Sequence, residues 1–171
     1  MDVGCGDGSL IAYLDDGSKR LTGIDINELC IAKANLEDNA ANTRFICCGF
    51  DTYEANHTYD AIIFVASLHH MDMTAAIEKS KELLSPNGVL IIVGLASPSS
   101  AIDYVIEGLR VLPCKIVSRF KHMQSSESQN IPVSYCVPSL NEVRDIANRL
   151  LPHASMNYGL FYRYLLMWCN C

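Results

Sequence analysis

Strand-like and helix-like segments alternate along the first 95 residues of this chain, and the alternation limits its fold more than any other feature. Apolar and β-branched runs predict five strands, at residues 1–3, 20–25, 43–48, 59–67 and 89–95. The segments between them carry apolar residues at helical spacing, at 9–16, 28–40 and 73–84, and Ser9, Asn27 and Asp72 are their expected N-caps. Because neighbouring parallel strands are joined by helical crossovers, this order predicts an α/β fold with a doubly wound, mostly parallel sheet.

The second half of the chain predicts a helix and a hairpin that would complete the same domain. Its segments are a helix at 102–112, an irregular stretch at 113–138, a helix at 140–151 and strands at 153–159 and 160–168. The strongest signal is the capping box formed by Ser139 and Glu142. The two strands are close enough to pair through a turn at Gly159. With 171 residues and no repeat or linker, we expect one domain spanning residues 1–171.

Charge and cysteine content narrow the class of partner and the compartment. The net charge of −6 disfavours nucleic acid or an anionic membrane as the main partner. The eight cysteines include no C-x-x-C pair, and the C-x-C of Cys169 and Cys171 has no further ligands nearby in sequence, so no metal site is predicted. The longest clean apolar run, at 61–68, is too short to span a bilayer, and no leader precedes it. We therefore expect a soluble, cytoplasmic protein whose cysteines are reduced.

The stretch "DVGCGDGSL" places Gly4, Gly6 and Gly8 between the first strand and the first helix. Glycine lets a ligand approach the backbone, and the helix start directs N–H groups at that ligand. Asp25 ends the second strand, where a carboxylate can accept hydrogen bonds from ribose hydroxyls. Dinucleotide enzymes use the spacing G-x-G-x-x-G, whereas G-x-G-x-G suits a ligand with no pyrophosphate. The spacing therefore opposes an NAD(P)-dependent oxidoreductase, which remains an alternative.

Four motifs in order resemble those of class I S-adenosylmethionine-dependent methyltransferases acting on small molecules. They are "DVGCGDG", "GID", "YDAIIFVASLHH" and "LLSPNGVLIIV". The resemblance implies a Rossmann-like sheet of seven strands in the order 3-2-1-4-5-7-6, with strand 7 antiparallel. It also implies S-adenosylmethionine as the cofactor, bound beyond the ends of the first two strands at the switch point of the sheet.

The resemblance further assigns a set of cofactor-binding residues. They are Asp2, Gly4, Cys5, Gly6, Gly8, Asp25, Ile26, Phe50, Asp51 and Ala66. Gly4 and Gly6 would line the methionine and ribose portions, Asp2 would reach the amino group, and Asp25 would hold the ribose diol. The alternative for the two acids is a role as capping carboxylates. If Asp25 is partly exposed at a strand tip, its removal should change the stability of the free protein by less than about 1 kcal/mol.

The adenine end of the site departs from the family pattern. The family often carries Gly-Asp after the third strand, whereas this chain has "CGFDT", with Phe50 between Gly49 and Asp51. Asp51 is then the candidate for the adenine amino group and Phe50 for a wall beside the ring. A buried core position is the alternative for Phe50.

Methyl transfer from a sulfonium requires alignment and exclusion of water, and a base helps when the acceptor is a hydroxyl or an acidic carbon. His70, or less favourably His69, follows the fourth strand, and histidine is the residue type best suited to accept a proton near neutral pH. The alternative for both is to begin a helix or pack under a loop. No "DPPY" or "NPPF" follows the strand, which argues against methylation of nucleic-acid bases. We therefore expect a small-molecule acceptor, with a protein side chain as the next candidate, or else a methyltransferase-like fold without activity.

The chain begins inside its first motif, and only Met1, Asp2 and Val3 are left to build the predicted central strand. Three residues span about 10 Å, against about 17–20 Å for a typical strand. Family members also carry N-terminal helices over the cofactor. We therefore expect a longer natural protein, and a form extended upstream should melt at a higher temperature and bind cofactor more tightly. Equal melting temperatures and affinities for the two forms would contradict this expectation.

Overall fold

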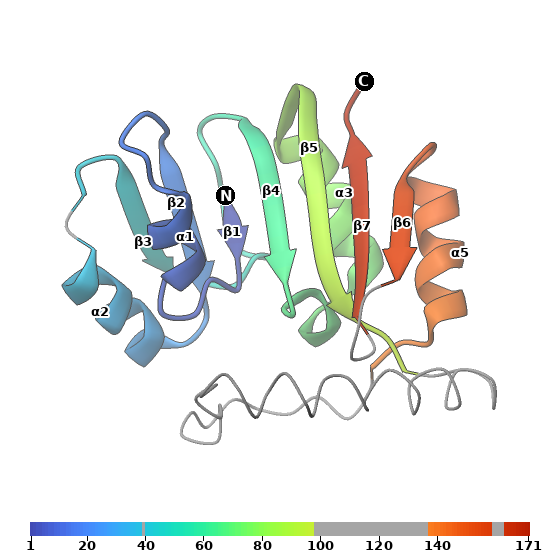
Figure 1. Ribbon diagram of the computed structural model, residues 1–171, viewed down its shortest axis with the longest axis horizontal. Helices are drawn as coiled ribbons and strands as arrows, with labels where there is room; N and C mark the ends of the chain where they lie inside the picture. The colour runs from blue at the N-terminus through green and yellow to red at the C-terminus, as the bar shows by residue number, and fades with distance from the viewer. Residues whose placement is uncertain (39, 98–136, 159–162) are drawn as a thin grey trace, which may run out of the picture.

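The computed structural model describes residues 1–38, 40–97, 137–158 and 163–171, and its centre is a seven-stranded sheet (Figure 1). The strands are β1 (Asp2–Val3), β2 (Leu21–Asp25), β3 (Thr43–Cys47), β4 (Tyr59–Val65), β5 (Leu84–Leu95), β6 (Ser155–Tyr158) and β7 (Arg163–Cys169). Their order is β3-β2-β1-β4-β5-β7-β6. β1 to β5 pair in parallel, and β7 pairs antiparallel with both β5 and β6. The predicted strand order, with β7 antiparallel, is confirmed.

Helices cover the sheet and follow the predicted capping pattern at three of four starts. They are α1 (Ser9–Leu14), α2 (Glu28–Glu37), the 3₁₀ helix η1 (Leu68–His70), α3 (Met73–Leu83) and α5 (Leu140–Leu150). Asn27 and Asp72 accept backbone hydrogen bonds at the starts of α2 and α3, and the capping box opens α5. Ser9 is not a cap: Gly8 takes that position with a φ of +80°, and the Ser9 hydroxyl donates to Asp7 at 2.6 Å instead.

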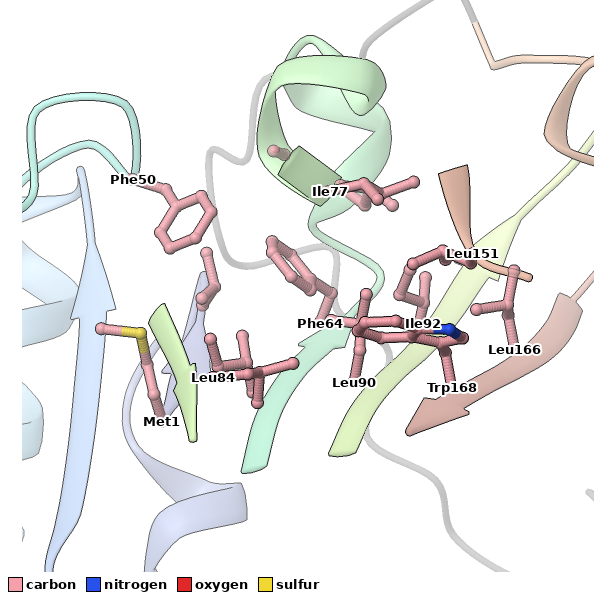
Figure 2. Close-up of a cluster of buried hydrophobic side chains, with 14 of the residues drawn as sticks. Met1, Phe50, Phe64, Ile77, Leu84, Leu90, Ile92, Leu151, Leu166 and Trp168 are labelled. Atoms are coloured by element: carbon pink, nitrogen blue, oxygen red, sulfur yellow. The ribbon is translucent and has the colours of Figure 1, made fainter. Parts of the chain in front are cut away.

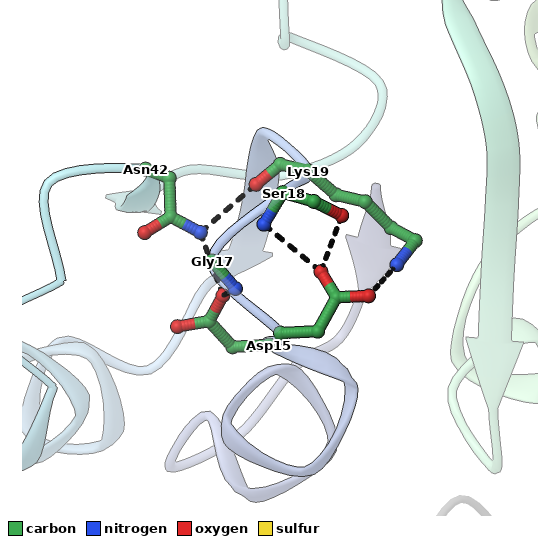
Figure 3. Close-up of polar contacts among 6 residues, drawn as sticks. Asp15, Gly17, Ser18, Lys19 and Asn42 are labelled. Atoms are coloured by element: carbon green, nitrogen blue, oxygen red, sulfur yellow. Dashed lines mark hydrogen bonds and ion pairs between the residues drawn. The ribbon is translucent and has the colours of Figure 1, made fainter.

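The helix expected at 9–16 ends two residues early because two carboxylates capture the following backbone (Figure 3). Asp15 Oδ1 accepts from Gly17 N at 2.9 Å, and Asp16 Oδ1 accepts from Ser18 N at 3.0 Å. Such bonds give the backbone an alternative to the helix. Asn42 donates to Asp15 Oδ1 at 2.6 Å and to the Lys19 carbonyl at 2.9 Å, which ties this turn to the start of β3.

The main core lies between the sheet and the pair α3 and α5, which contact each other (Figure 2). Its fully buried side chains include Phe64, Ile77, Leu90, Ile92, Leu151 and Leu166. Phe64 and Ile92 come from β4 and β5, and Ile77 comes from the face of α3 that covers them. This packing fixes α3 against β4, and so also fixes the segment between them, which carries both histidines.

The segment "SPNG" at residues 85–88 is incorporated into β5 as an irregularity. Tyr59 pairs with Leu84, while Ala61 pairs with Val89, so the extra residues bulge out of the ladder. Asn87 adopts a φ of +64° within this bulge. The strand predicted at 89–95 therefore begins earlier, because Leu84 already pairs with Tyr59 of β4.

The expected pairing of the last two strands is observed, with Tyr158 opposite Tyr164. The helix at 102–112, nearly all of the irregular stretch and the turn at Gly159 lie outside the described residues. Within the described ranges, no helix has the length and apolar content needed to cross a membrane.

Candidate cofactor site

The glycine turn wraps over the end of β2 and is held there by backbone hydrogen bonds. Gly4 N and Cys5 N both donate to the Ile24 carbonyl, at 2.8 and 3.0 Å. Gly4, Gly6 and Gly8 have φ values of +73°, +55° and +80°, a region that other residues adopt at a cost. The three glycines are therefore required by this path of the backbone.

A Cβ at these glycines would meet very different surroundings. At Gly4 it would lie 2.4 Å from Ser67 Cβ, and at Gly8 it would lie 2.7 Å from the Phe45 ring. At Gly6 it would meet no atom within 4 Å. Gly4 and Gly8 therefore serve close packing, whereas Gly6 faces open space that a ligand can enter.

Asp25 joins the tip of β2 to the glycine turn. Its Oδ2 accepts from Gly6 N at 2.9 Å, and its Oδ1 accepts from Asn27 N at 2.8 Å. The side chain is only partly buried, as predicted. Each oxygen has further lone pairs, so the carboxylate can accept additional hydrogen bonds from a ligand. Gly6 and Asp25 thus lie at the same edge of the sheet, where the sequence places them.

Asp2 is a buried carboxylate at the start of the same turn. It lies in β1 opposite Gly23 of β2, and 4% of its surface is exposed. Its Oδ1 has no hydrogen-bond partner among the described residues. Burial raises the pKa of Asp2 to about 6, an effect that the Met1 ammonium opposes and Asp25 reinforces. An unpaired buried carboxylate is costly, and a cationic ligand group would compensate it.

Strained backbone follows β4 on the other side of the turn. Ala66 adopts a φ of +53°, which is rare for a residue with a Cβ and is often found at functional sites. Ser67 donates its hydroxyl to the Val3 carbonyl at 2.5 Å, which joins this segment to β1. No local pattern singles out Ser67, since only the fold brings it against Gly4.

The two histidines occupy η1 with their rings adjacent, at a centroid separation of 4.0 Å. His70 is exposed, while His69 is half-buried and its Nδ1 lacks a hydrogen-bond partner in the described ranges. Burial, together with His70, lowers the pKa of His69, which keeps its imidazole neutral at pH 7. They are the last two residues of this short helix, which begins at Leu68 rather than at either histidine.

The segment after β3 directs its two candidate residues in opposite directions. Phe50 is 5% exposed and packs edge-on against Phe64, with ring centroids 5.4 Å apart (Figure 2). Asp51 is exposed. Lys79 of α3 donates to the Asp51 carbonyl at 2.8 Å and lies 5.6 Å from the Phe50 ring centroid. A ligand at this edge would therefore meet Asp51 and the local backbone, with the Phe50 ring beneath them.

Ile26 is a large apolar side chain left in solvent at the same edge. It follows Asp25 directly and is 75% exposed. Exposing such a side chain forgoes about 1.5–3 kcal/mol of burial that a flat apolar ligand group could recover. Cys47 lies beside it, with its thiol 3.7 Å from the Ile26 carbonyl.

Together these residues fit a ligand with an amino group, a ribose and a flat base. The orphaned Asp2 oxygen suits the cation, Asp25 suits the diol beside the open space at Gly6, and Ile26 suits an apolar ring face. Among the described residues, no group of three His, Cys, Asp or Glu side chains gathers to hold a metal ion.

Comparison with known proteins gives the same family from two directions. A family model described as a methyltransferase domain matches residues 1–92. An uncharacterized methyltransferase of Mycobacterium tuberculosis is 30% identical over 175 residues, covering 98% of this chain and 85% of that protein. The ubiquinone biosynthesis O-methyltransferase of Haemophilus ducreyi is 29% identical over 126 residues, 66% of this chain and 53% of that enzyme.

The fold is shared with solved structures at lower identity. The N-methyltransferase NodS of Bradyrhizobium japonicum, in complex with S-adenosyl-L-homocysteine, superposes with a TM-score of 0.66 at 17% identity. The match covers 99% of this chain and 76% of that one. Because the family model spans more than half of its residues, the chain belongs to the methyltransferase domain family, that of the class I S-adenosylmethionine-dependent methyltransferases.

Proposed function

We propose that this protein transfers a methyl group from S-adenosylmethionine to a small-molecule acceptor. The observation that carries the proposal is the unpartnered Asp2 carboxylate beside the open space at Gly6 and the ribose-binding carboxylate Asp25. A cationic amino group and a diol are the two features of the cofactor that these acids recognise. We place the protein in the cytoplasm, since its described cysteines are free thiols.

We assign each residue a cofactor role that its position supports. Asp2 binds the amino group, Asp25 binds the ribose, and the backbone of Gly4, Cys5 and Gly6 lines the path between them. Ile26 packs on one face of the adenine, and Asp51 accepts from its amino group. Gly8 and Phe50 support the site from below: Gly8 lets α1 begin against Phe45, and Phe50 anchors the Asp51 segment to Phe64.

The acceptor side of the site is formed after β4, by Ala66 and η1. When bound, the cofactor supplies a sulfonium methyl group with a good leaving group. The chain's own task is to align the acceptor and to take its proton if the acceptor is a hydroxyl. His70 is the exposed ring of the pair, and His69 supports it from behind. We assign the proton transfer to His70 and a positioning role to His69.

Replacement of His70 by Ala should lower kcat and leave cofactor affinity unchanged. A general base typically contributes about 10²–10⁴-fold, and less where alignment dominates, so we expect a fall of about tenfold or more. The measurement is turnover of an acceptor identified from a panel of small hydroxyl and amine compounds, beside titration with S-adenosylhomocysteine. A variant with wild-type kcat would show that no base acts at this position.

The acceptor class has indirect support from the relatives. The ubiquinone biosynthesis O-methyltransferase of H. ducreyi is an O-methyltransferase, and the structural neighbour NodS is an N-methyltransferase. The histidine pair favours a hydroxyl acceptor, because an amine attacks in its neutral form without a base. We therefore place a small hydroxyl compound first and an amine second.

Calorimetric titration tests the cofactor. We expect the protein to bind S-adenosylhomocysteine and to show no heat with NAD at the same concentration. Binding of NAD alone would support the oxidoreductase alternative. Binding of S-adenosylhomocysteine without turnover of any acceptor would support the alternative of a methyltransferase-like fold that binds cofactor but has no activity.

A further inference from the structure

Cys169 and Cys171 form a thiol pair that the proposed function does not use. Their sulfurs lie 3.0 Å apart, and both side chains are exposed. Cys169 is the last residue of β7, on the face that also exposes Met167. Residues two apart along a strand point to the same side, which brings the two thiols together.

The residue between them is fixed by four hydrogen bonds. Asn170 N donates to the Gly88 carbonyl at 2.9 Å, and the Asn170 carbonyl accepts from Asn87 N at 2.7 Å. Its side-chain amide donates to the Leu84 and Ser85 carbonyls, both at 3.3 Å. The backbone that carries the thiols is therefore held against the irregular start of β5, and the pair is preorganised.

The geometry favours a covalent bond between the sulfurs over a metal site. Two residues of fully extended strand span about 6.6 Å, at the upper end of the range of about 4.4–6.8 Å found in disulfides. The sulfurs are already in contact at 3.0 Å. Rotation of the two side chains needs to bring them only about 1 Å closer to reach the bond length of about 2.05 Å. Within the described ranges no third metal-ligating side chain joins them.

We propose that Cys169 and Cys171 are a reversible dithiol–disulfide site, oxidised by a low-molecular-weight disulfide. The Cys171 thiolate attacks one sulfur of the small disulfide, whose S–S bond breaks and releases a thiolate that takes up a proton. The Cys169 thiolate then attacks the Cys171 sulfur and releases the second small thiol. The protein loses two electrons and two protons, and the small disulfide gains both to become two thiols.

The contact between the two sulfurs also bears on which thiol attacks first. The hydrogen bond with Cys171 raises the pKa of Cys169, with a small contribution from burial. A raised pKa lowers the thiolate fraction of Cys169, so we assign the first attack to Cys171. A bridge over one residue at an exposed position belongs to the labile class of disulfides, so thiols should reverse it.

The pair also lies far from the cofactor site. The glycine turn lies where the carboxyl ends of β1 and β4 meet. Strand β7 runs antiparallel to them, so its last residue lies at the opposite end of the strands (Figure 1). Its chemistry can thus be measured without cofactor or acceptor.

The experiment exposes the whole protein to glutathione disulfide, blocks remaining thiols by alkylation and maps the peptides by mass. Cleavage after Arg163 releases a peptide whose only cysteines are Cys169 and Cys171. We expect this peptide to lack two hydrogens, to carry no alkyl group and to return to the dithiol with dithiothreitol. In Cys169→Ser, glutathione should remain on Cys171, at a level about tenfold or more above wild type, because the neighbouring thiol no longer displaces it.

Cys47→Ser is the matched control, because it removes another exposed thiol, at the cofactor edge. Its yield of the Cys169–Cys171 bridge should equal that of wild type. The proposal is overturned if wild type keeps glutathione or alkyl groups on both cysteines, or if either pairs with Cys47 instead.

Discussion

Replacement of Asp25 by Ala should weaken S-adenosylhomocysteine binding by about two orders of magnitude or more. Hydrogen bonds to a charged group contribute about 1.5–3 kcal/mol each, and the ribose diol supplies two of them. Since about 1.4 kcal/mol is tenfold, the loss of both gives this factor. Loss of the hydrogen bond that Gly6 N donates to Asp25 also frees the turn that the cofactor must contact.

The same substitution should destabilise the free protein, more than the sequence alone predicts. From the sequence alone we expect a loss of less than about 1 kcal/mol, because the carboxylate is only partly buried. Asp25 also accepts backbone hydrogen bonds from Gly6 and Asn27. Even when the contribution of these two hydrogen bonds is reduced for partial exposure, their loss should cost about 1–3 kcal/mol of folding free energy. Denaturant melts of wild type and Asp25→Ala measure this cost.

Asp15→Ala is the matched control for this result. Asp15 also accepts two hydrogen bonds, from Gly17 N and the Asn42 amide, but it lies in the turn after α1 (Figure 3). Its removal should lower stability by a similar amount and leave the affinity unchanged. If Asp25→Ala melts early yet binds like wild type, Asp25 is scaffold and the proposed cofactor site is wrong.

Replacement of Asp2 by Asn should have opposite effects on affinity and on stability. Loss of the charge that faces the cofactor's amino group should weaken binding by about 10- to 100-fold. The pKa of Asp2 rises from 3.8 to about 6 on folding, which corresponds to about 3 kcal/mol against the ionised form. Because Asn still leaves a polar group buried, we expect a gain of about 1–2 kcal/mol at pH 7.5.

The stability of the folded state depends on pH with a defined sign. Between about pH 4 and 6 the folded state holds a proton on Asp2 that the unfolded state has lost, so this group favours folding increasingly as pH falls through 6. The Met1 ammonium, whose pKa burial lowers from 8.0 to about 6, acts with the opposite sign, and it does so between about pH 6 and 8. Asp25 and Cys5 also face Asp2. The difference between wild type and Asp2→Asn therefore isolates the contribution of Asp2.

Affinity should follow the ionised fraction of Asp2. In wild type the affinity for S-adenosylhomocysteine should fall by up to about tenfold per pH unit below about 6, and in Asp2→Asn this slope should be absent. Asp38→Asn is the control, since Asp38 Oδ2 is also buried without a partner among the described residues but lies after α2, away from the glycine turn. Parallel pH profiles for wild type and Asp2→Asn would remove Asp2 from the site.

The sequence by itself determined the elements and much of the candidate site. Local signals suffice for this, because caps, turns and apolar periodicity act over a few residues: Asn27, Asp72 and the Ser139–Glu142 box each open a helix as predicted. The motif order indicated the strand order and placed Gly6 and Asp25 at one edge. The errors are local competitions, such as Gly8 replacing Ser9 as the cap of α1.

Only the tertiary structure decided how the candidate residues are used. Burial, which no local pattern specifies, leaves Asp2 without a partner and raises its pKa. Packing against Phe64 places the Phe50 ring in the core. Helix α3 places Lys79, almost thirty residues further along the chain, over the same ring. These contacts join segments distant in sequence, and their energies depend on desolvation and close packing that exist only once the sheet and helices have assembled.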